Sequence, residues 1–318
     1  MKLEDIGFYT LSDQRADGAA IDSRLMRAEL LLTARCNFHC PYCRGVGGQD
    51  LSLAAALEVI HYWTAQKLFA LRLSGGEPLL YKGLTELVEA AREGGVEKIA
   101  ISSNGSFPLK NYLALIAAGV NDFSISLDAC CAQDGEKMAG GVKGSWARVV
   151  ANIRALSPLT YVSVGVVLTE DNQAKVGEII KFAANLGVAD IRVIPAAQKG
   201  KRLAPVKIDP EILARLPILR YRLANLAAGA AVRGLSSSDA DHCGLVLDDM
   251  AVCEGRHYPC IIYLREGGES IGPVGPEMRR QRALWSASHD TGQDPICAGN
   301  CLDVCVAYNN RFWASHQD

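Results

Sequence analysis

The chain has 318 residues, of which 49% are hydrophobic and 21% charged, a composition typical of a globular protein with a large core. Its net charge of −2 argues against a surface for nucleic acid or for an anionic membrane, and no apolar run reaches the roughly 18–20 residues that span a bilayer. The charged N-terminus lacks the apolar segment of a signal peptide, so we expect a cytoplasmic protein. Its eleven cysteines therefore favour metal or redox chemistry over disulfides.

Apolar runs of strand length alternate with amphipathic helical segments over about 170 residues. This alternation predicts parallel βαβ units, and six units are too few to close an eight-stranded barrel. The sequence therefore predicts an α/β fold, a partial (β/α)6 TIM-like barrel with functional residues at the C-terminal ends of its strands. The expected strands are 29–33, 70–74, 98–102, 122–127, 161–168 and 190–194.

The pattern changes after residue 195. A loop rich in basic residues leads into one or two helices broken at Pro217, and a β-hairpin is expected after Cys243. A helix is expected over 276–289. We predict an N-terminal arm at 1–27, the barrel at 28–200, a helical linker at 201–240 and a small cysteine-rich α+β appendage at 241–318.

Three cysteines directly follow the first expected strand, namely Cys36, Cys40 and Cys43. Three thiolates on one loop can hold three irons of a cubic [4Fe–4S] cluster and leave the fourth iron open to another ligand. A structural zinc site is the alternative. Zinc usually takes four closed ligands, and this loop offers neither a fourth cysteine nor a well-spaced histidine.

This triplet resembles the signature of the radical S-adenosylmethionine (SAM) superfamily. Tyr42 stands where the family places an aromatic residue near the adenine. Residues 74–78 read Ser-Gly-Gly-Glu-Pro and look like the family's GGEP motif, which holds the methionine amino group. Gly75 and Gly76 would allow a close backbone approach, and Glu77 would offer a carboxylate to an ammonium group.

The ends of the next two strands resemble further SAM-contacting segments of the family, and the resemblance covers roughly residues 28–195. Together with Tyr42 and Gly75 to Glu77, the residues that it implies for SAM binding are Pro78, Ser102, Asn104, Ser124, Ser126 and Asp128.

The resemblance implies that SAM is cleaved reductively to a 5′-deoxyadenosyl radical, which abstracts hydrogen from a small molecule or short peptide. A flavodoxin- or ferredoxin-type protein would supply the electron, and the outcome would be dehydrogenation or epimerisation. A molybdopterin-precursor-type cyclase is an alternative. Others are an activase that forms a glycyl radical, and a non-catalytic iron–sulfur or zinc protein with a degenerate SAM site.

Six of the eleven cysteines lie after residue 240. The spacing of Cys243, Gly255 and Cys260 resembles the opening of the twitch or SPASM appendages that follow many radical SAM barrels. That resemblance implies an auxiliary [4Fe–4S] cluster, and a zinc knot is the alternative. Gly299 and Asn300 favour a loop over one continuous helix in the last cysteine segment. The expected ligands are Cys243, Cys260 and two of Cys297, Cys301 and Cys305.

Three cysteines remain, namely Cys130, Cys131 and Cys253. At most one of them would donate a hydrogen atom to a substrate radical. The alternative is the usual role of a free cysteine as a small buried apolar residue.

Basic residues in and after the sixth strand could meet a substrate carboxylate or phosphate, although a solvated loop is an alternative for the lysines. These residues are Arg192, Lys199, Lys201 and Arg202.

Overall fold

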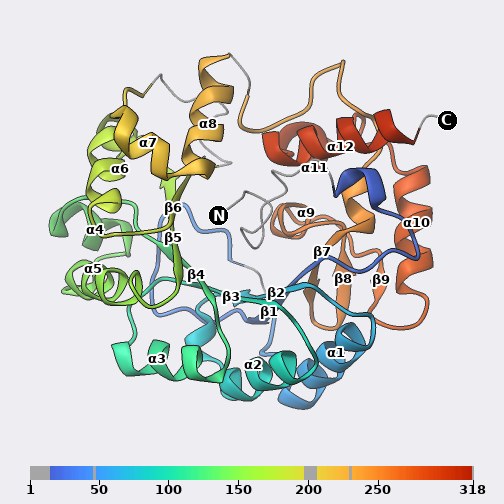
Figure 1. The fold of residues 1–318 in the computed structure, drawn as a ribbon, viewed down its shortest axis with the longest axis horizontal. Coiled ribbons are helices and arrows are strands. Elements are labelled where there is room, and N and C mark those ends of the chain that lie inside the picture. Colours follow the sequence, from blue (N-terminus) through green and yellow to red (C-terminus); the bar gives the residue numbers. More distant parts are fainter. Residues whose placement is uncertain (1–14, 46–47, 197–205, 229–230, 317–318) are drawn as a thin grey trace.

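The structure is a computed structural model that describes residues 15–45, 48–196, 206–228 and 231–316. Its framework is one nine-stranded sheet with the order β6-β5-β4-β3-β2-β1-β7-β8-β9 (Figure 1). Neighbouring strands from β6 through β1 to β7 are parallel, whereas β8 and β9 are antiparallel additions. The barrel strands are β1 (Arg27–Thr33), β2 (Ala70–Gly75), β3 (Lys98–Ser103), β4 (Asp122–Ser126), β5 (Tyr161–Leu168) and β6 (Asp190–Pro195).

Helices cover the outer face of these strands (Figure 1). The first shows why: Ser52 caps its N-terminus, and Ala56, Val59, Ile60 and Trp63 recur at helical spacing and are buried. The helices of this part are α1 (Leu53–Ala65), α2 (Leu84–Glu93), α3 (Leu109–Ala118), α4 (Ala132–Met138), α5 (Ser145–Leu156), α6 (Val176–Ala184), α7 (Pro210–Arg215) and α8 (Pro217–Ala227).

The predicted partial barrel is confirmed, and each expected strand ends within two residues of the observed one. Parallel strands are buried on both faces, which makes them apolar runs that a sequence reveals well. In β1 all seven residues are buried, including the inward-facing Arg27 and Glu29. Such buried charges need partners, and Arg27 pairs with Asp249 while Glu29 accepts the hydroxyl of Ser74.

The cysteine-rich C-terminal region continues the barrel sheet. Its first strand, β7 (Asp249–Cys253), pairs in parallel with β1, and a tight turn leads to β8 (Arg256–Tyr258). Glu254 and Gly255 form the turn with positive φ angles of 51° and 73°. The remaining elements are α9 (Ile261–Arg265), β9 (Gly272–Pro273), α10 (Met278–Ser288), α11 (Pro295–Asn300) and α12 (Asp303–Ser315).

A short N-terminal stretch packs against this region. Ala16 and Ala19 join Leu245, Tyr308 and Phe312 in a small apolar cluster, separate from the main core. The predicted domain boundaries stay predictions, because the sheet runs through the expected border between barrel and appendage. None of the described helices is both long enough and apolar enough to cross a membrane.

Candidate active site

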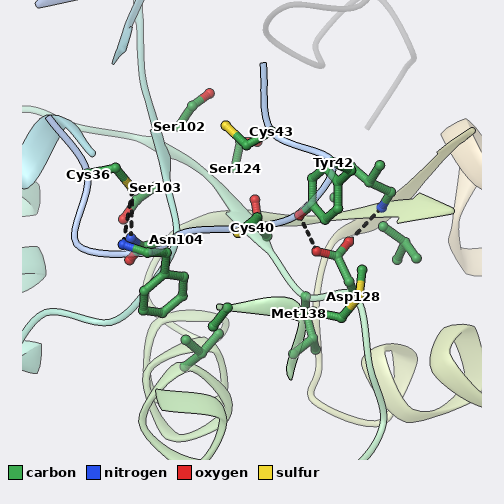
Figure 2. A pocket seen from close by; sticks show the side chains of 18 of the residues that line it. Cys36, Cys40, Tyr42, Cys43, Ser102, Ser103, Asn104, Ser124, Asp128 and Met138 are labelled. Atoms are coloured by element: carbon green, nitrogen blue, oxygen red, sulfur yellow. Dashed lines mark hydrogen bonds between the residues drawn. The ribbon is translucent and has the colours of Figure 1, made fainter. Parts of the chain in front are cut away.

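Cys36, Cys40 and Cys43 all line a cavity of about 320 Å³ at the C-terminal ends of the barrel strands (Figure 2). Their loop is fixed by backbone hydrogen bonds from Cys43 to Cys40 (3.0 Å) and from His39 to Ala139 (3.1 Å). Burial raises the pKa of the Cys40 thiol to about 12, because a bare thiolate is poorly solvated there. A bound metal cation would reverse that preference, so the donor set fits an iron–sulfur cluster.

The two glycines at the end of β2 bring the backbone against the residues that lead into the cysteine loop. The amide of Gly76 donates to the carbonyl of Thr33 at 2.6 Å. A Cβ on Gly75 would lie 2.3 Å from that carbonyl oxygen, and one on Gly76 would lie 2.2 Å from the carbonyl oxygen of Arg35. Only glycine fits this approach, which leaves Gly75 and Gly76 among the residues that line the cavity.

The expected contact of the Glu77 carboxylate with an ammonium group stays a prediction. The side chain of this residue is fully buried, and neither Glu77 nor Pro78 is among the lining residues of the cavity. The carboxylate accepts hydrogen bonds from the Ser103 hydroxyl (2.9 Å) and from the amides of Leu79 (3.1 Å) and Asn104 (2.7 Å). Burial raises the pKa of Glu77 to about 7. These hydrogen bonds link the segment after β2 to the end of β3.

The other residues expected to contact SAM do line the cavity. The side-chain amide of Asn104 donates to Asn37 of the cysteine loop at 2.8 Å and lies 3.9 Å from the sulfur of Cys36 (Figure 2). The lining residues from the ends of β2, β3 and β4 and from the cysteine loop include Tyr42, Ser102, Asn104, Ser124, Ser126 and Asp128.

Tyr42 and Asp128 form a pair across the cavity floor (Figure 2). The Tyr42 hydroxyl donates to the Asp128 carboxylate, which also accepts the amide of Val167 at 2.6 Å. Burial raises the pKa of Asp128 to about 6. The pair ties the cysteine loop to the ends of β4 and β5.

Sequence reasoning missed Arg265, which reaches this cavity from α9 in the C-terminal region. Its guanidinium donates to the carbonyls of Arg44 and Gly75, both at 3.4 Å. The neighbouring Glu266 forms an ion pair with Arg44. No local motif marks Arg265, because only the fold brings α9 to the cysteine loop.

The five C-terminal cysteines that include the expected ligands of the auxiliary cluster line one small cavity of about 40 Å³. The sulfur of Cys243 accepts the side-chain amide of Asn309 at 3.5 Å, and that of Cys260 accepts the amide of Tyr263 at 3.4 Å. Burial raises the pKa of Cys243 to about 11. The lining cysteines are Cys243, Cys260, Cys297, Cys301 and Cys305.

The last three of these cysteines do not share one helix. Cys297 is in α11, Cys301 follows the last residue of that helix, and Cys305 is in α12. The break falls just after the expected turn at Gly299 and Asn300. Ligand atoms of Cys297, His289 and Asp294 also lie within 4.8 Å of one another. Soft thiolates enclosed in this way suit an iron–sulfur cluster.

Cys130, Cys131 and Cys253 do not lie among the residues that line the first cavity. The sulfur of Cys130 lies 3.9 Å from a carboxylate oxygen of Glu178, and Cys131 precedes α4. Cys253 ends β7. The hydrogen-donor role stays a prediction that this geometry does not support.

Of the basic residues expected to meet a substrate, Arg192 lines the cavity, whereas Lys199, Lys201 and Arg202 lie outside the described residues.

Comparison with known families identifies the domain. The model of the radical SAM superfamily matches residues 30–183. These residues form a radical SAM domain. The superfamily uses a [4Fe–4S] cluster and SAM, and these are the cofactors of the domain.

Curated relatives match this radical SAM domain over part of their length. A GTP 3′,8-cyclase of Synechococcus sp. (strain CC9605) is 39% identical over 126 residues, which is 35% of this chain and 36% of that protein. Molybdenum cofactor biosynthesis protein 1 of Drosophila melanogaster is 31% identical over 173 residues, 51% of this chain and 30% of that protein. The chain thus spans only about a third of the length of these two relatives.

Solved structures share the fold beyond the radical SAM domain. The anSMEcpe structure with bound AdoMet superimposes with a TM-score of 0.60 at 12% identity and covers 92% of this chain and 95% of its own. Streptococcus suis SuiB gives a TM-score of 0.57 at 14% identity, with 86% and 67% covered. The likeness therefore includes the cysteine-rich C-terminal region as well as the barrel.

Proposed function

We propose that the protein is a radical SAM enzyme that abstracts hydrogen from a small-molecule or short peptide substrate and oxidises or epimerises it. The observation that carries the proposal is that three thiols, two close-packed glycines and the ends of β3 and β4 border one cavity. When bound, the cluster and SAM supply a 5′-deoxyadenosyl radical, the hydrogen-abstracting species.

The chain's own residues would bind and orient these groups. We assign the cluster to Cys36, Cys40 and Cys43 and the methionine end of SAM to the backbone at Gly75 and Gly76. Tyr42 would border the adenine, held in place by its hydrogen bond to Asp128. Arg265 would close the site from the C-terminal region and exclude water, because it already touches Gly75 and the cysteine loop.

We assign the C-terminal cysteine cavity to an auxiliary [4Fe–4S] cluster with Cys243, Cys260 and two of the last three cysteines as ligands. All eleven cysteines are free thiols in the structure, which suits the cytoplasm and a flavodoxin- or ferredoxin-type electron donor. Such a cluster would accept an electron from the substrate radical and favour dehydrogenation.

A cyclase of the molybdopterin-precursor type is the second candidate. It is favoured by the two curated relatives, which are named as a GTP 3′,8-cyclase and a molybdenum cofactor biosynthesis protein. Both alignments cover a minority of those proteins, so the likeness supports the radical SAM domain more strongly than the substrate. Incubation of the holoenzyme with GTP, SAM and reductant, with analysis of the nucleotide product, separates this candidate from the first.

The proposed activity is tested by anaerobic reconstitution with iron and sulfide, followed by SAM and dithionite. We expect 5′-deoxyadenosine to form in the wild type and not in Cys40→Ala. An iron-loaded wild type that forms no 5′-deoxyadenosine would instead support a non-catalytic iron–sulfur protein.

A further inference from the structure

A second cavity, of about 270 Å³, lies inside the barrel beside the cavity at Cys36, Cys40 and Cys43, which we call the SAM cavity. Residues of β1, β2 and β6 line it on the barrel side, and residues of α8, α9 and α12 line it on the C-terminal side. Arg192, Ile194 and Arg265 line both cavities, so the two spaces adjoin. Cys260 and Cys305 line both the second cavity and the auxiliary cysteine cavity. The second cavity therefore lies between the two cysteine sets.

Positive charge dominates its lining. Seven arginines border the cavity against three carboxylates, which are Glu29, Asp249 and Glu266. These arginines come from strands, helices and loops that are far apart in the sequence, so the fold gathers them. They are Arg27, Arg44, Arg72, Arg192, Arg222, Arg233 and Arg265.

Arg27, Arg44 and Arg222 each form an ion pair with a carboxylate. Arg27 pairs with Asp249 at 2.5 Å, Arg44 pairs with Glu266, and Arg222 pairs with Asp303 at 2.9 Å. The side chains of Arg222 and Asp303 are 4% and 5% exposed, so each compensates the buried charge of the other where α8 meets α12. These three contacts are structural and do not require a ligand.

Arg233 and Arg265 differ from those three. Within the described part of the chain, the hydrogen bonds of both go to carbonyl oxygens: Arg233 donates to Pro195 at 3.2 Å, and Arg265 donates to Arg44 and Gly75. Nη1 of Arg233 is buried and has no hydrogen-bond partner among the described residues. Burial, reinforced by the charges of Arg44 and Arg222, lowers the pKa of Arg233 to about 10.

A buried cation among other cations is costly, and an anion bound beside it would offset the cost. The planar guanidinium donates parallel hydrogen bonds that match the oxygens of a phosphate group. A phosphate or polyphosphate also carries more charge per volume than one carboxylate and can engage several guanidinium groups at once.

We propose that the second cavity binds the phosphate or polyphosphate group of the substrate. The reacting carbon would then lie at the junction marked by Arg192, Ile194 and Arg265, facing the SAM cavity. Cys260 and Cys305 border the same space from the other side, so the bound substrate would also lie next to the auxiliary cysteine set. This assignment rests on the proposed function, because it supplies the substrate end of the same site.

The test uses the anaerobically reconstituted holoenzyme and isothermal titration calorimetry with sodium tripolyphosphate, and with citrate at equal ionic strength. Arg233→Gln is the test variant. Arg220→Gln is the matched control, since Arg220 is exposed on α8 and its side chain donates only to carbonyls of Leu213 and Ala214 in the described residues. Iron content and circular dichroism check that each variant is loaded and folded.

We expect tripolyphosphate to bind the wild type and Arg220→Gln with one site and equal affinity. Loss of one charged hydrogen-bond donor predicts binding to Arg233→Gln that is weaker by about tenfold or more. Citrate should bind at least about tenfold more weakly than tripolyphosphate. Absence of saturable binding, or equal affinity in Arg233→Gln, overturns the site, and equal binding of citrate overturns the assignment to phosphate.

A second measurement covers the case in which Arg233→Gln does not fold. Phenylglyoxal modifies accessible arginines, and peptide mass spectrometry locates the modified residues. Tripolyphosphate should protect Arg233 and Arg265 in the wild-type holoenzyme but leave Arg220 reactive, and equal modification with and without it contradicts the site. The formation of 5′-deoxyadenosine by the same sample is scored separately, so the anion site can fail while the radical SAM activity stands, or the reverse.

Discussion

The two cysteine sets of this protein are built in opposite ways. Cys36, Cys40 and Cys43 lie on one loop, with Cys36 and Cys43 exposed, beside a cavity of about 320 Å³. The C-terminal five come from separate elements and enclose a cavity of about 40 Å³. Three ligands beside open space leave room for a second molecule, whereas an enclosed set can complete a cluster from the protein alone. The contrast agrees with the proposal that the first set is the reactive centre and the second set is an electron-handling or structural one.

The largest effect is expected from removing one ligand in each set. Cys40→Ala should lower 5′-deoxyadenosine formation by at least about a hundredfold, because even groups that only support a ligand typically contribute 10–100-fold. Cys260→Ala should retain measurable SAM cleavage but lose coupling to product. High-performance liquid chromatography of 5′-deoxyadenosine measures SAM cleavage in both variants. Equal losses of 5′-deoxyadenosine in the two variants would contradict the different roles of the two cysteine sets.

A smaller effect is expected at the glycine contact that shapes the open centre. In Gly76→Ala the new Cβ would lie 2.2 Å from the carbonyl oxygen of Arg35, so the cysteine loop must shift. We expect a loss of about 2–4 kcal/mol of stability together with weaker SAM binding.

Gly18→Ala is the control for this change, because nothing lies within 4 Å of its added Cβ. Thermal unfolding and SAM titration measure both variants. Equal melting temperatures for Gly76→Ala and Gly18→Ala would show that the glycine approach does not shape the site.

The smallest effect concerns Asp190, which joins the barrel to the helices leading to the C-terminal region. Its carboxylate accepts the amides of Ile218 (2.9 Å) and Leu219 (3.2 Å) at the start of α8. Burial raises the pKa of Asp190 to about 6, so the carboxyl group of Asp190 binds a proton more tightly in the folded state than in the unfolded state. Its contribution to stability is therefore present below pH 4 and is lost as the pH rises towards 6.

Asp190→Asn removes this titration. Between pH 4 and 6 the wild-type melting temperature should fall relative to that of the variant by a few degrees, corresponding to about 1–3 kcal/mol. Scanning calorimetry across this range gives the two slopes. Parallel slopes would mean that Asp190 does not titrate differently in the folded state.

Local signals explain what the sequence predicts well. The strands are buried apolar runs, and the Cys36 loop and the two glycines are contiguous motifs placed at strand ends. What depends on distant pairing is not predictable in this way. The position of β7 beside β1, the inward turn of Glu77 and the arrival of Arg265 at the cysteine loop each require the assembled sheet.

The site formed by the C-terminal cysteines is partly predictable from the sequence. Their number indicated a metal site, and Gly299 and Asn300 predicted a break that the structure places just after them, at Cys301 and Leu302. Which thiols face one another depends on how α9, α11 and α12 pack, and the arginines of the second cavity depend on the same packing. The number of cysteines therefore indicates the kind of site, whereas the arrangement of its ligands depends on the packing of the helices.

The central claim is that two separate cysteine sets hold two four-iron clusters. The most direct test is the iron content per chain of the reconstituted wild type and of the Cys36→Ala, Cys40→Ala, Cys43→Ala triple variant. The account predicts about eight iron atoms in the wild type and about four in the variant. About four falling to none would contradict it, because the C-terminal cysteines would then hold no cluster.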